Sequence, residues 1–241
     1  MKIYVIGTGP GGLSEMTGRA RKAIESCQVV AGYVLYIELL RELLEDKEVI
    51  STGMTGEARR CKAALEAALS GKQVCVISGG DAGVYGMAGL VLELCEHFPQ
   101  IEVEVIPGVT AACSASAVLG APLTHDFAAI SLSDRLTDWN LIEKRLRLAA
   151  EADFVICLYN PSSKARRDYL KRACQIIMEH RTAKTCCGAV RNIGRDGESG
   201  QMMSLNELCD FDCDMFTTVV IGNSATRVIG GRLVTPRGYA L

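Results

Sequence analysis

Short apolar runs alternate with helical patterns along the 241 residues of the chain. Continuous apolar runs bounded by glycine are typical of parallel strands that are covered on both faces. Helical patterns with an apolar stripe follow most of these runs. This βαβα order predicts an α/β protein whose first half is built on a mainly parallel five-stranded sheet. The strands of the first half are expected at residues 2–6, 28–31, 48–51, 74–78 and 103–106, and its helices at 13–27, 32–43, 57–69, 84–98 and 109–119.

The second half has fewer helices between its apolar runs and more loops, so we expect a mixed α+β domain there. Glycine and proline cluster at residues 120–122, where the first set of five strands has ended, and such clusters mark linkers between domains. The predicted domains are therefore residues 1–120 and 121–241. In the second domain, strands are expected at 127–132, 154–158, 185–190 and 215–222, and helices at 141–150 and 162–180.

Two of the predicted strands run directly into glycine-bearing turns, Gly79-Gly80-Asp81 and Pro107-Gly108-Val109-Thr110. In open α/β sheets, ligands collect outside the carboxyl ends of the strands, so we expect these two loops to form one site. Glycine lets a ligand approach the main chain closely, and the Asp81 carboxylate is placed to accept from ligand hydroxyl or amino groups. An alternative interpretation is that Asp81 only caps a tight turn.

A third loop, Gly7-Thr8-Gly9-Pro10-Gly11-Gly12, fits the spacing of a dinucleotide-binding loop. However, Pro10 has no N–H for a pyrophosphate, and Gly32-Tyr33 stands where an acidic residue would bind the ribose. We therefore interpret this loop as the wall of a pocket. An NAD(P)-dependent oxidoreductase remains an alternative function, and a non-catalytic binding module is a further one.

Composition excludes several classes of protein. Lys and Arg total 26 against 28 for Asp and Glu, and the net charge of −2 gives no electrostatic basis for nucleic-acid binding. The 11 cysteines include no CxxC pair, which indicates reduced thiols in a cytoplasmic protein and neither a disulfide framework nor a metal site. No signal peptide is expected, because the first residues already form a strand. No membrane span is expected either, because the longest uncharged run is broken by glycine and proline.

Several motifs, in this order, resemble the tetrapyrrole (corrin/porphyrin) methyltransferase family, whose members use S-adenosylmethionine. They are 5–11, 78–81 and 107–111. Three further stretches resemble the members that methylate C17 of precorrin-3B or cobalt-precorrin-3 and contract the ring in cobalamin biosynthesis. They are 123–134, 158–163 and 191–195. A sister enzyme that methylates another ring carbon, of a precorrin or of uroporphyrinogen, is the alternative within the family.

The resemblance implies two α/β domains with the cofactor in the cleft between them, and a homodimer. It implies these cofactor contacts: Pro10, Gly79, Gly80, Asp81, Val84, Thr110, Ala111, Leu158, Tyr159 and Ala189. For proton transfers during ring contraction we name Asp134, His125 and Ser131 as candidates. The carboxylates of the macrocycle are expected to bind basic residues among Arg59, Arg60, Arg135, Lys164, Arg166, Arg191 and Arg195.

Overall fold

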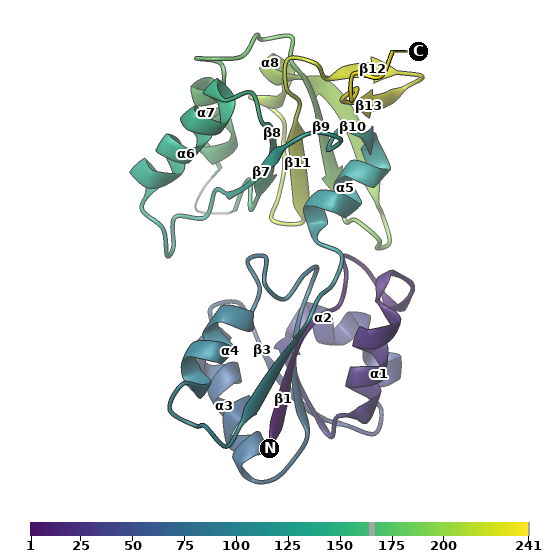
Figure 1. The fold of residues 1–241 in the computed structure, drawn as a ribbon, viewed down its shortest axis with the longest axis vertical. Coiled ribbons are helices and arrows are strands. Elements are labelled where there is room, and N and C mark those ends of the chain that lie inside the picture. The colour runs from purple at the N-terminus through teal and green to yellow at the C-terminus, as the bar shows by residue number, and fades with distance from the viewer. Residues whose placement is uncertain (164–166, 241) are drawn as a thin grey trace. The chain divides into compact units, whose positions relative to one another are not determined.

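The computed structural model describes residues 1–163 and 167–240. The chain forms two compact units, Met1–Ala111 and Ala112–Leu241, and each has its own sheet (Figure 1). The predicted division at 120/121 counted helix α5 (Ala111–Leu119) in the first domain, whereas nearly all of α5 belongs to the second unit. The reason is that α5 packs against the sheet of the second unit. Its Leu119 lies so close to Gly188 of that sheet that a Cβ added to Gly188 would be 2.6 Å from Leu119 Cδ1.

The first unit is built on a five-stranded sheet with the order β3-β2-β4-β1-β5. Every neighbouring pair in it is parallel, which confirms the predicted parallel sheet. All residues of the central strand β4 are buried, as expected for a strand covered on both faces. The strands are β1 (Lys2–Gly7), β2 (Val29–Tyr33), β3 (Glu48–Thr52), β4 (Val74–Ser78) and β5 (Glu102–Ile106).

The helices of the first unit are α1 (Gly18–Ser26), α2 (Val34–Leu39), α3 (Glu57–Leu69) and α4 (Ala88–Cys95), with 3-10 turns at Leu13–Glu15 and Arg41–Leu43. They cover both faces of the sheet, α3 and α4 on one and α1 and α2 on the other (Figure 1). Successive strand residues point to opposite faces, so two cores form. Val5 and Val76 pack into the core with α3 and α4. Ile6 and Ile77 pack into the other.

Helix α3 has the predicted bounds, but α1 and α4 begin four or more residues later than predicted. Helix α1 begins at Gly18 because Thr17 caps it, accepting a hydrogen bond from Ala20 N at 3.1 Å through its side chain. Helix α4 begins only at Ala88, because the preceding loop includes Tyr85 with a φ of 54°. Both delays leave long loops at the carboxyl ends of β1 and β4.

The second unit contains a mixed sheet with the order β10-β9-β11-β8-β7. Strands β7 and β8 are parallel, β11 is antiparallel to both β8 and β9, and β10 is antiparallel to β9. This confirms the mixed character expected of the second half. The strands are β7 (Phe127–Ser131), β8 (Val155–Tyr159), β9 (Cys186–Arg191), β10 (Ser199–Ser204) and β11 (Thr217–Ile221).

The remaining helices of this unit are α6 (Trp139–Glu151), α7 (Tyr169–Ile177) and α8 (Leu205–Leu208). Helix α7 was predicted over 162–180, but in the described residues it begins at Tyr169 and ends at Ile177. A small third sheet, β12-β13-β6, adds β12 (Arg227–Ile229), β13 (Arg232–Val234) and β6 (Gly120–Ala121). The sequence analysis did not predict β6, β10, β12 or β13.

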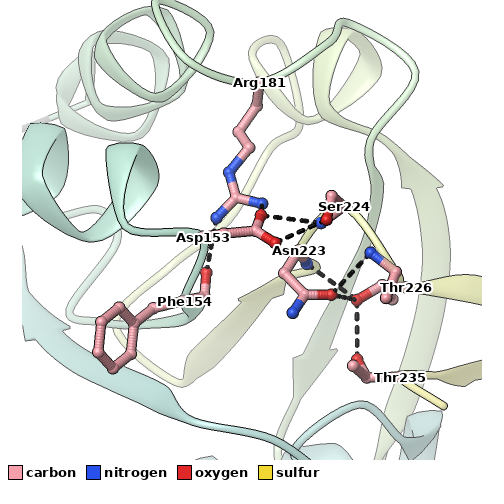
Figure 2. A network of polar contacts seen from close by, with 8 residues as sticks. Asp153, Phe154, Arg181, Asn223, Ser224, Thr226 and Thr235 are labelled. Carbon is pink, nitrogen blue, oxygen red and sulfur yellow. Dashed lines mark hydrogen bonds and ion pairs between the residues drawn. The ribbon is translucent and has the colours of Figure 1, made fainter. Parts of the chain in front are cut away.

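A polar network fixes the segment after β11, as Figure 2 shows. The Asp153 carboxylate accepts from Ser224 N at 3.0 Å and from Ser224 Oγ at 2.6 Å, and it forms an ion pair with Arg181. The hydroxyls of Thr226 and Thr235 lie 2.8 Å apart. Partial burial raises the pKa of Asp153, but hydrogen bonds from Ser224 and the Arg181 guanidinium outweigh burial and hold that pKa below its usual value.

Candidate functional site

Three loops of the first unit meet where β1, β4 and β5 end. Gly9 and Gly80 form a two-way main-chain bridge, with 3.0 Å from Gly9 N to Gly80 O and 2.6 Å from Gly80 N to Gly9 O. Thr8 N donates to Ser78 O at 2.9 Å, and the Thr8 hydroxyl donates to the same oxygen at 3.1 Å. The loop after β1 is therefore fixed directly to the loop after β4.

Glycine is required in these loops because their main chains touch one another. A Cβ added to Gly108 would lie 2.2 Å from Gly80 O, and one added to Gly7 would lie 2.6 Å from Gly108 N. Gly80 itself has a φ of 71°, a conformation that favours glycine. The sequence analysis assigned such glycines to the approach of a ligand, whereas contact between the loops already requires Gly7 and Gly108.

Asp81 lies at the junction of these loops, and main-chain N–H groups donate to both of its carboxylate oxygens. Oδ1 accepts from Gly83 N at 2.8 Å and from Val84 N at 3.1 Å, which closes a turn of the Asx type. Oδ2 accepts from Gly108 N at 3.0 Å and so joins the loop after β4 to the loop after β5. Asp81 is thus a brace between two loops, as well as a candidate ligand contact.

The other predicted cofactor residues of the first unit surround this brace. Pro10 is buried, and Val84, Thr110 and Ala111 are half-buried. Thr110 Cα and Ala111 N would each lie 3.7 Å from a Cβ on Gly80, so residues 109–111 lie against the glycine turn. The structure therefore gathers these predicted contacts at one edge: Pro10, Gly79, Gly80, Asp81, Val84, Thr110 and Ala111.

The three loops carry almost no charge. Segments 7–12, 79–87 and 107–111 contain no Lys, Arg or His and a single carboxylate, Asp81. Polar contacts with a ligand would therefore come mainly from main-chain N–H and C=O groups. This chemistry suits a neutral or cationic ligand and offers no counter-charge to a diphosphate.

Arg59 and Arg60, both predicted to bind substrate, differ sharply in environment. Arg59 is exposed on α3, whereas Arg60 is only 4% exposed. Arg60 Nη1 donates to Thr52 Oγ1 at 2.7 Å and Nη2 lies 3.4 Å from Met87 Sδ. Its buried Nε has no hydrogen-bond partner among the residues that the structure describes. Arg60 therefore links the end of β3 to the start of α4, and Arg59 is the one that solvent reaches.

Three loops of the second unit also share one edge of their sheet. Ser131 at the end of β7 lies opposite Tyr159 at the end of β8. Strand β9 runs in the same direction as β8, since both are antiparallel to β11. The segments that follow Ser131, Tyr159 and Arg191 therefore lie at the same edge, which is where the three second-domain motifs of the sequence occur.

Two asparagines turn the chain sharply at this edge. Asn160 and Asn192 have φ values of 52° and 53°, in a left-handed region that asparagine tolerates better than most residues. Asn160 Nδ2 donates to Ser131 Oγ at 2.9 Å, and Ser133 N donates to the same oxygen at 3.2 Å. Ser131, a candidate for proton transfer, is thus held in place by its neighbours.

The three predicted cofactor contacts of the second unit present different groups. The Tyr159 hydroxyl accepts from Ala112 N at 2.8 Å, at the start of α5. Leu158 and Ala189 are buried in the hydrophobic core, and both pair with Val219 of β11. A ligand contact at Leu158 or Ala189 is therefore left to the main chain.

Of the three candidates for proton transfer, Ser131 and Asp134 lie at this edge and His125 does not. Asp134 Oδ2 accepts from the Tyr169 hydroxyl at 2.6 Å, and this hydrogen bond raises the pKa of Tyr169. His125 is exposed and precedes β7, so the length of that strand, roughly 13 Å at 3.3 Å per residue, separates it from Ser131. The structure does not bring His125 together with the other two.

The predicted basic residues of the second unit are also unlike one another. Arg135 is exposed, and no described residue forms an ion pair with it. Arg191 Nε lies 3.4 Å from Asp214 Oδ2, and the Arg195 guanidinium lies 5.9 Å from the centroid of the Phe216 ring. Two more predicted substrate residues lie outside the described residues, Lys164 and Arg166.

The sequence analysis missed a cluster next to Asp134. The rings of Trp139 and Tyr169 lie 4.2 Å apart between centroids, and the Arg172 guanidinium lies 4.4 Å from the Trp139 ring. Arg172 is neutralised by Glu143 at 3.2 Å. Only the four-residue spacing of Trp139 and Glu143 on one helix was visible in the sequence; the contacts with α7 depend on tertiary packing.

Two further properties bear on the site. Among the described residues, no group of three or more His, Cys, Asp or Glu side chains is placed to hold a metal ion. In the same part of the chain, no helix has both the length and the apolar character that crossing a membrane requires. All 11 cysteines are free thiols.

Comparison with known proteins identifies the family. A sequence profile described as "Tetrapyrrole (Corrin/Porphyrin) Methylases" matches residues 2–209. The chain belongs to the tetrapyrrole methylase family. A relative in this family, the "Probable cobalt-factor III C(17)-methyltransferase" of Salmonella typhimurium, is 48% identical over 99% of the chain and 100% of its own length. The "Cobalt-factor III methyltransferase" of Priestia megaterium is 46% identical over 99% of the chain, which spans 45% of that protein.

Solved structures agree with this membership of the tetrapyrrole methylases. The crystal structure of the methyltransferase CobJ superposes with a TM-score of 0.90 at 35% identity, covering 97% of the chain and 99% of CobJ. A uroporphyrin-III C-methyltransferase of Thermus thermophilus, complexed with S-adenosylhomocysteine, has the same fold with a TM-score of 0.71 at 21% identity, covering 92% of each chain. The family that the sequence motifs indicated is confirmed.

Proposed function

We propose that this chain transfers the methyl group of S-adenosylmethionine to C17 of a tetrapyrrole and contracts its ring, as a step of cobalamin biosynthesis. The substrate is cobalt-factor III or metal-free precorrin-3B. The observation that carries the proposal is the 48% identity, along the whole chain, to a relative named for methylation at C(17) of cobalt-factor III. Membership of a family that uses S-adenosylmethionine supports the choice of cofactor.

The loops of the first unit fit this cofactor by their chemistry. S-adenosylmethionine carries a sulfonium cation and no phosphate, and it supplies an activated methyl group. The segments that surround Asp81 carry no basic side chain that would repel the cation. We assign the cofactor to the main chain of Gly79, Gly80, Thr110 and Ala111, with Pro10 and Val84 as apolar contacts.

From the second unit, Leu158, Tyr159 and Ala189 complete the proposed cofactor contacts. The Tyr159 ring offers an apolar face, whereas Leu158 and Ala189 contribute their main-chain groups, because their side chains are part of the core. These three assignments follow from the resemblance to the tetrapyrrole methylase family, and substitution of Tyr159 tests the most accessible of them.

The same loops argue against the alternative of an NAD(P)-dependent oxidoreductase. In a dinucleotide-binding loop the glycines lead straight into a helix whose N-terminus holds the pyrophosphate. Here residues 8–17, including the 3-10 turn Leu13–Glu15, separate β1 from α1. Strand β2 ends at Tyr33 and offers no carboxylate to a ribose.

The main contribution of the protein to this reaction is to position the methyl group and the attacking carbon. Methyl transfer to carbon is an in-line displacement, so a precise approach of the two reactants supplies much of the acceleration, on the order of 7 kcal/mol or more. We assign Arg59, Arg135, Arg191 and Arg195 to the carboxylates of the macrocycle, since Arg60 is buried. Ser131 and Asp134 are assigned to proton transfer during ring contraction.

Two ligands separate this proposal from the oxidoreductase. Calorimetry of the full chain should show binding of S-adenosylhomocysteine and none of NADH, and the reverse would overturn the proposal. Incubation with radiolabelled S-adenosylmethionine should then label cobalt-factor III or precorrin-3B. Labelling of uroporphyrinogen III alone would assign the chain to the sister reaction instead.

Assembly and location complete the proposal. We assign a homodimer that acts in the cytoplasm, following the expectation from the family. Light scattering after size-exclusion chromatography should give twice the chain mass of 25.9 kDa. A mass of one chain would remove the dimer from the proposal without affecting the assigned reaction.

A further inference from the structure

The loop between β7 and α6 presents a leucine to solvent in an unusual way. Leu136, within residues 133–138, is 100% exposed, whereas Leu132 just before this loop is fully buried. A single exposed apolar side chain is common on protein surfaces and by itself indicates nothing. The residues around Leu136 are what indicate a binding role.

Hydrogen bonds anchor this loop on both sides of Leu136. Before it, Asp134 Oδ2 accepts from the Tyr169 hydroxyl at 2.6 Å. After it, the Asp138 carboxylate caps α6 and accepts from Asn140 N at 2.9 Å. Leu136 thus lies on a loop whose two ends are fixed, so the main chain of the loop loses little conformational freedom when a ligand binds there.

Tyr169, which holds Asp134, is part of a cluster with Trp139 and Arg172. The Tyr169 and Trp139 rings are tilted by 42° with 4.2 Å between their centroids, and the Arg172 guanidinium lies over both rings, 4.4 Å from Trp139 and 5.4 Å from Tyr169. Glu143 neutralises Arg172 at 3.2 Å. Arg135, beside Leu136, is exposed and forms no ion pair with a described residue, so its positive charge can meet an anionic ligand.

The loop leaves β7 at the edge that also carries Ser131 and Tyr159. A flat macrocycle with carboxylates at its periphery needs an apolar contact for its face and a cation for its rim. An exposed leucine next to an exposed arginine supplies both from adjacent positions.

We propose that Arg135 and Leu136 form a two-point contact for the tetrapyrrole substrate, with Leu136 against the macrocycle and the Arg135 guanidinium on a peripheral carboxylate. Tyr169 is a positioning residue, because it acts through Asp134 and holds the loop in place. This inference rests on the proposed function. It adds Leu136, which the sequence motifs do not indicate, to Arg135, which was already expected to bind a carboxylate. It also gives Asp134 a structural task besides its assigned part in proton transfer.

The test is substitution of Leu136 by serine in the full chain, with cobalt-factor III as substrate. Because Leu136 is fully exposed, Leu136→Ser should leave the thermal unfolding midpoint and the affinity for S-adenosylhomocysteine unchanged. KM for the tetrapyrrole should rise roughly tenfold, the scale expected when one leucine loses its apolar contact. Leu148→Ser is the matched control, since Leu148 is 52% exposed on the neighbouring helix α6.

Arg135→Gln should raise the same KM and weaken its dependence on ionic strength, because the charged contact is lost. Tyr169→Phe should raise KM and speed amide hydrogen exchange of residues 133–137, whereas Leu136→Ser should not change that exchange. An unchanged KM for Leu136→Ser overturns the proposal. A change in the oligomeric mass of Leu136→Ser also overturns the proposal, because it would show that a second copy of the chain covers the leucine.

Failure of the proposed function can be told apart from failure of this inference. Trp139 is the one tryptophan of the chain and lies three residues beyond Leu136, so a bound tetrapyrrole should quench its fluorescence. If the native chain transfers no methyl group, the proposed function fails. Quenching titrations of the native chain and Leu136→Ser with precorrin-type tetrapyrroles then decide the inference: equal dissociation constants, or no quenching by either, overturn it.

Discussion

Replacing Asp81 by asparagine changes the junction of the three glycine loops with almost no change in shape. The native carboxylate accepts from Gly83 N, Val84 N and Gly108 N. An amide has one oxygen and one NH2 group. If the oxygen stays with Gly83 and Val84, the NH2 group faces the N–H of Gly108, donor against donor, and the link between the two loops is lost.

The size of the effect follows from the lost contacts. A hydrogen bond to a charged group contributes about 1.5–3 kcal/mol, and a donor left without a partner adds a further cost when it is buried. Gly108 is half-buried, so water reaches it in part. We therefore expect a local loss of about 2 kcal/mol for the loops after β4 and β5.

Amide hydrogen exchange measures this loss at the right place. Each 1.4 kcal/mol changes an equilibrium constant tenfold, so exchange at Gly108 should become roughly 30-fold faster in Asp81→Asn. Calorimetry on the same sample should show weaker binding of S-adenosylhomocysteine. Glu45→Gln, which removes an exposed carboxylate elsewhere in the first unit, is the control and should change neither quantity.

The two readouts separate a brace from a direct ligand contact. A brace loosens the ligand-free protein, whereas a pure ligand contact affects only binding. If Asp81→Asn weakens binding but leaves exchange at Gly108 at the native rate, the bracing role is refuted. If both stay at native values, Asp81 has neither role.

Two other substitutions test other parts of the structure. Gly108→Ala places a Cβ 2.2 Å from Gly80 O, so we expect a destabilisation of about 2–3 kcal/mol, measured by thermal unfolding, and lost binding of S-adenosylhomocysteine. Asp153→Asn should destabilise the chain by about 2 kcal/mol at pH 7, because it removes a charged partner of Arg181, whose side chain is 5% exposed. The lowered pKa of Asp153 sets the sign with pH: its stabilisation is present above the unfolded pKa of about 3.9 and is lost as pH falls through the lower folded value.

Each of these predictions has a control in the chain. Gly89→Ala adds a Cβ in α4 where no atom lies within 4 Å, so it should not destabilise the protein. Asparagine accepts the φ of 60° at position 153, so Asp153→Asn tests charge and not backbone strain. A midpoint difference between Asp153→Asn and the native chain that persists unchanged at pH 3 would contradict the assigned role of the carboxylate.

The parts of the fold that were predictable are those that local patterns determine. Strand β4 reads as an apolar run bounded by glycine, and α3 carries an unbroken helical pattern, so both were placed well. The hairpin of β12 and β13 was missed although Gly230 and Gly231, with φ values of 55° and 73°, form a typical hairpin turn signal. Its strands are only three residues long and mostly exposed, so they lack an apolar pattern.

The candidate site was predictable in location but not in its internal contacts. Glycine-bearing loops after predicted strands indicated which edge of the first sheet carries the site, because parallel strands place their carboxyl ends together. No sequence pattern reports that Gly108 N turns toward Asp81, or that Arg60 is buried while Arg59 is exposed. Such contacts depend on how the loops pack, and so does the separation of His125 from Ser131 by the length of β7.

The central claim is transfer of a methyl group to C17, and one spectrum tests it most directly. The full chain is incubated anaerobically with cobalt-factor III and S-adenosylmethionine labelled with ¹³C in the methyl group, and the product is examined by NMR. We predict one new labelled methyl on C17 of a contracted ring. A labelled methyl on any other carbon, or no labelled tetrapyrrole from either cobalt-factor III or precorrin-3B, would contradict the account.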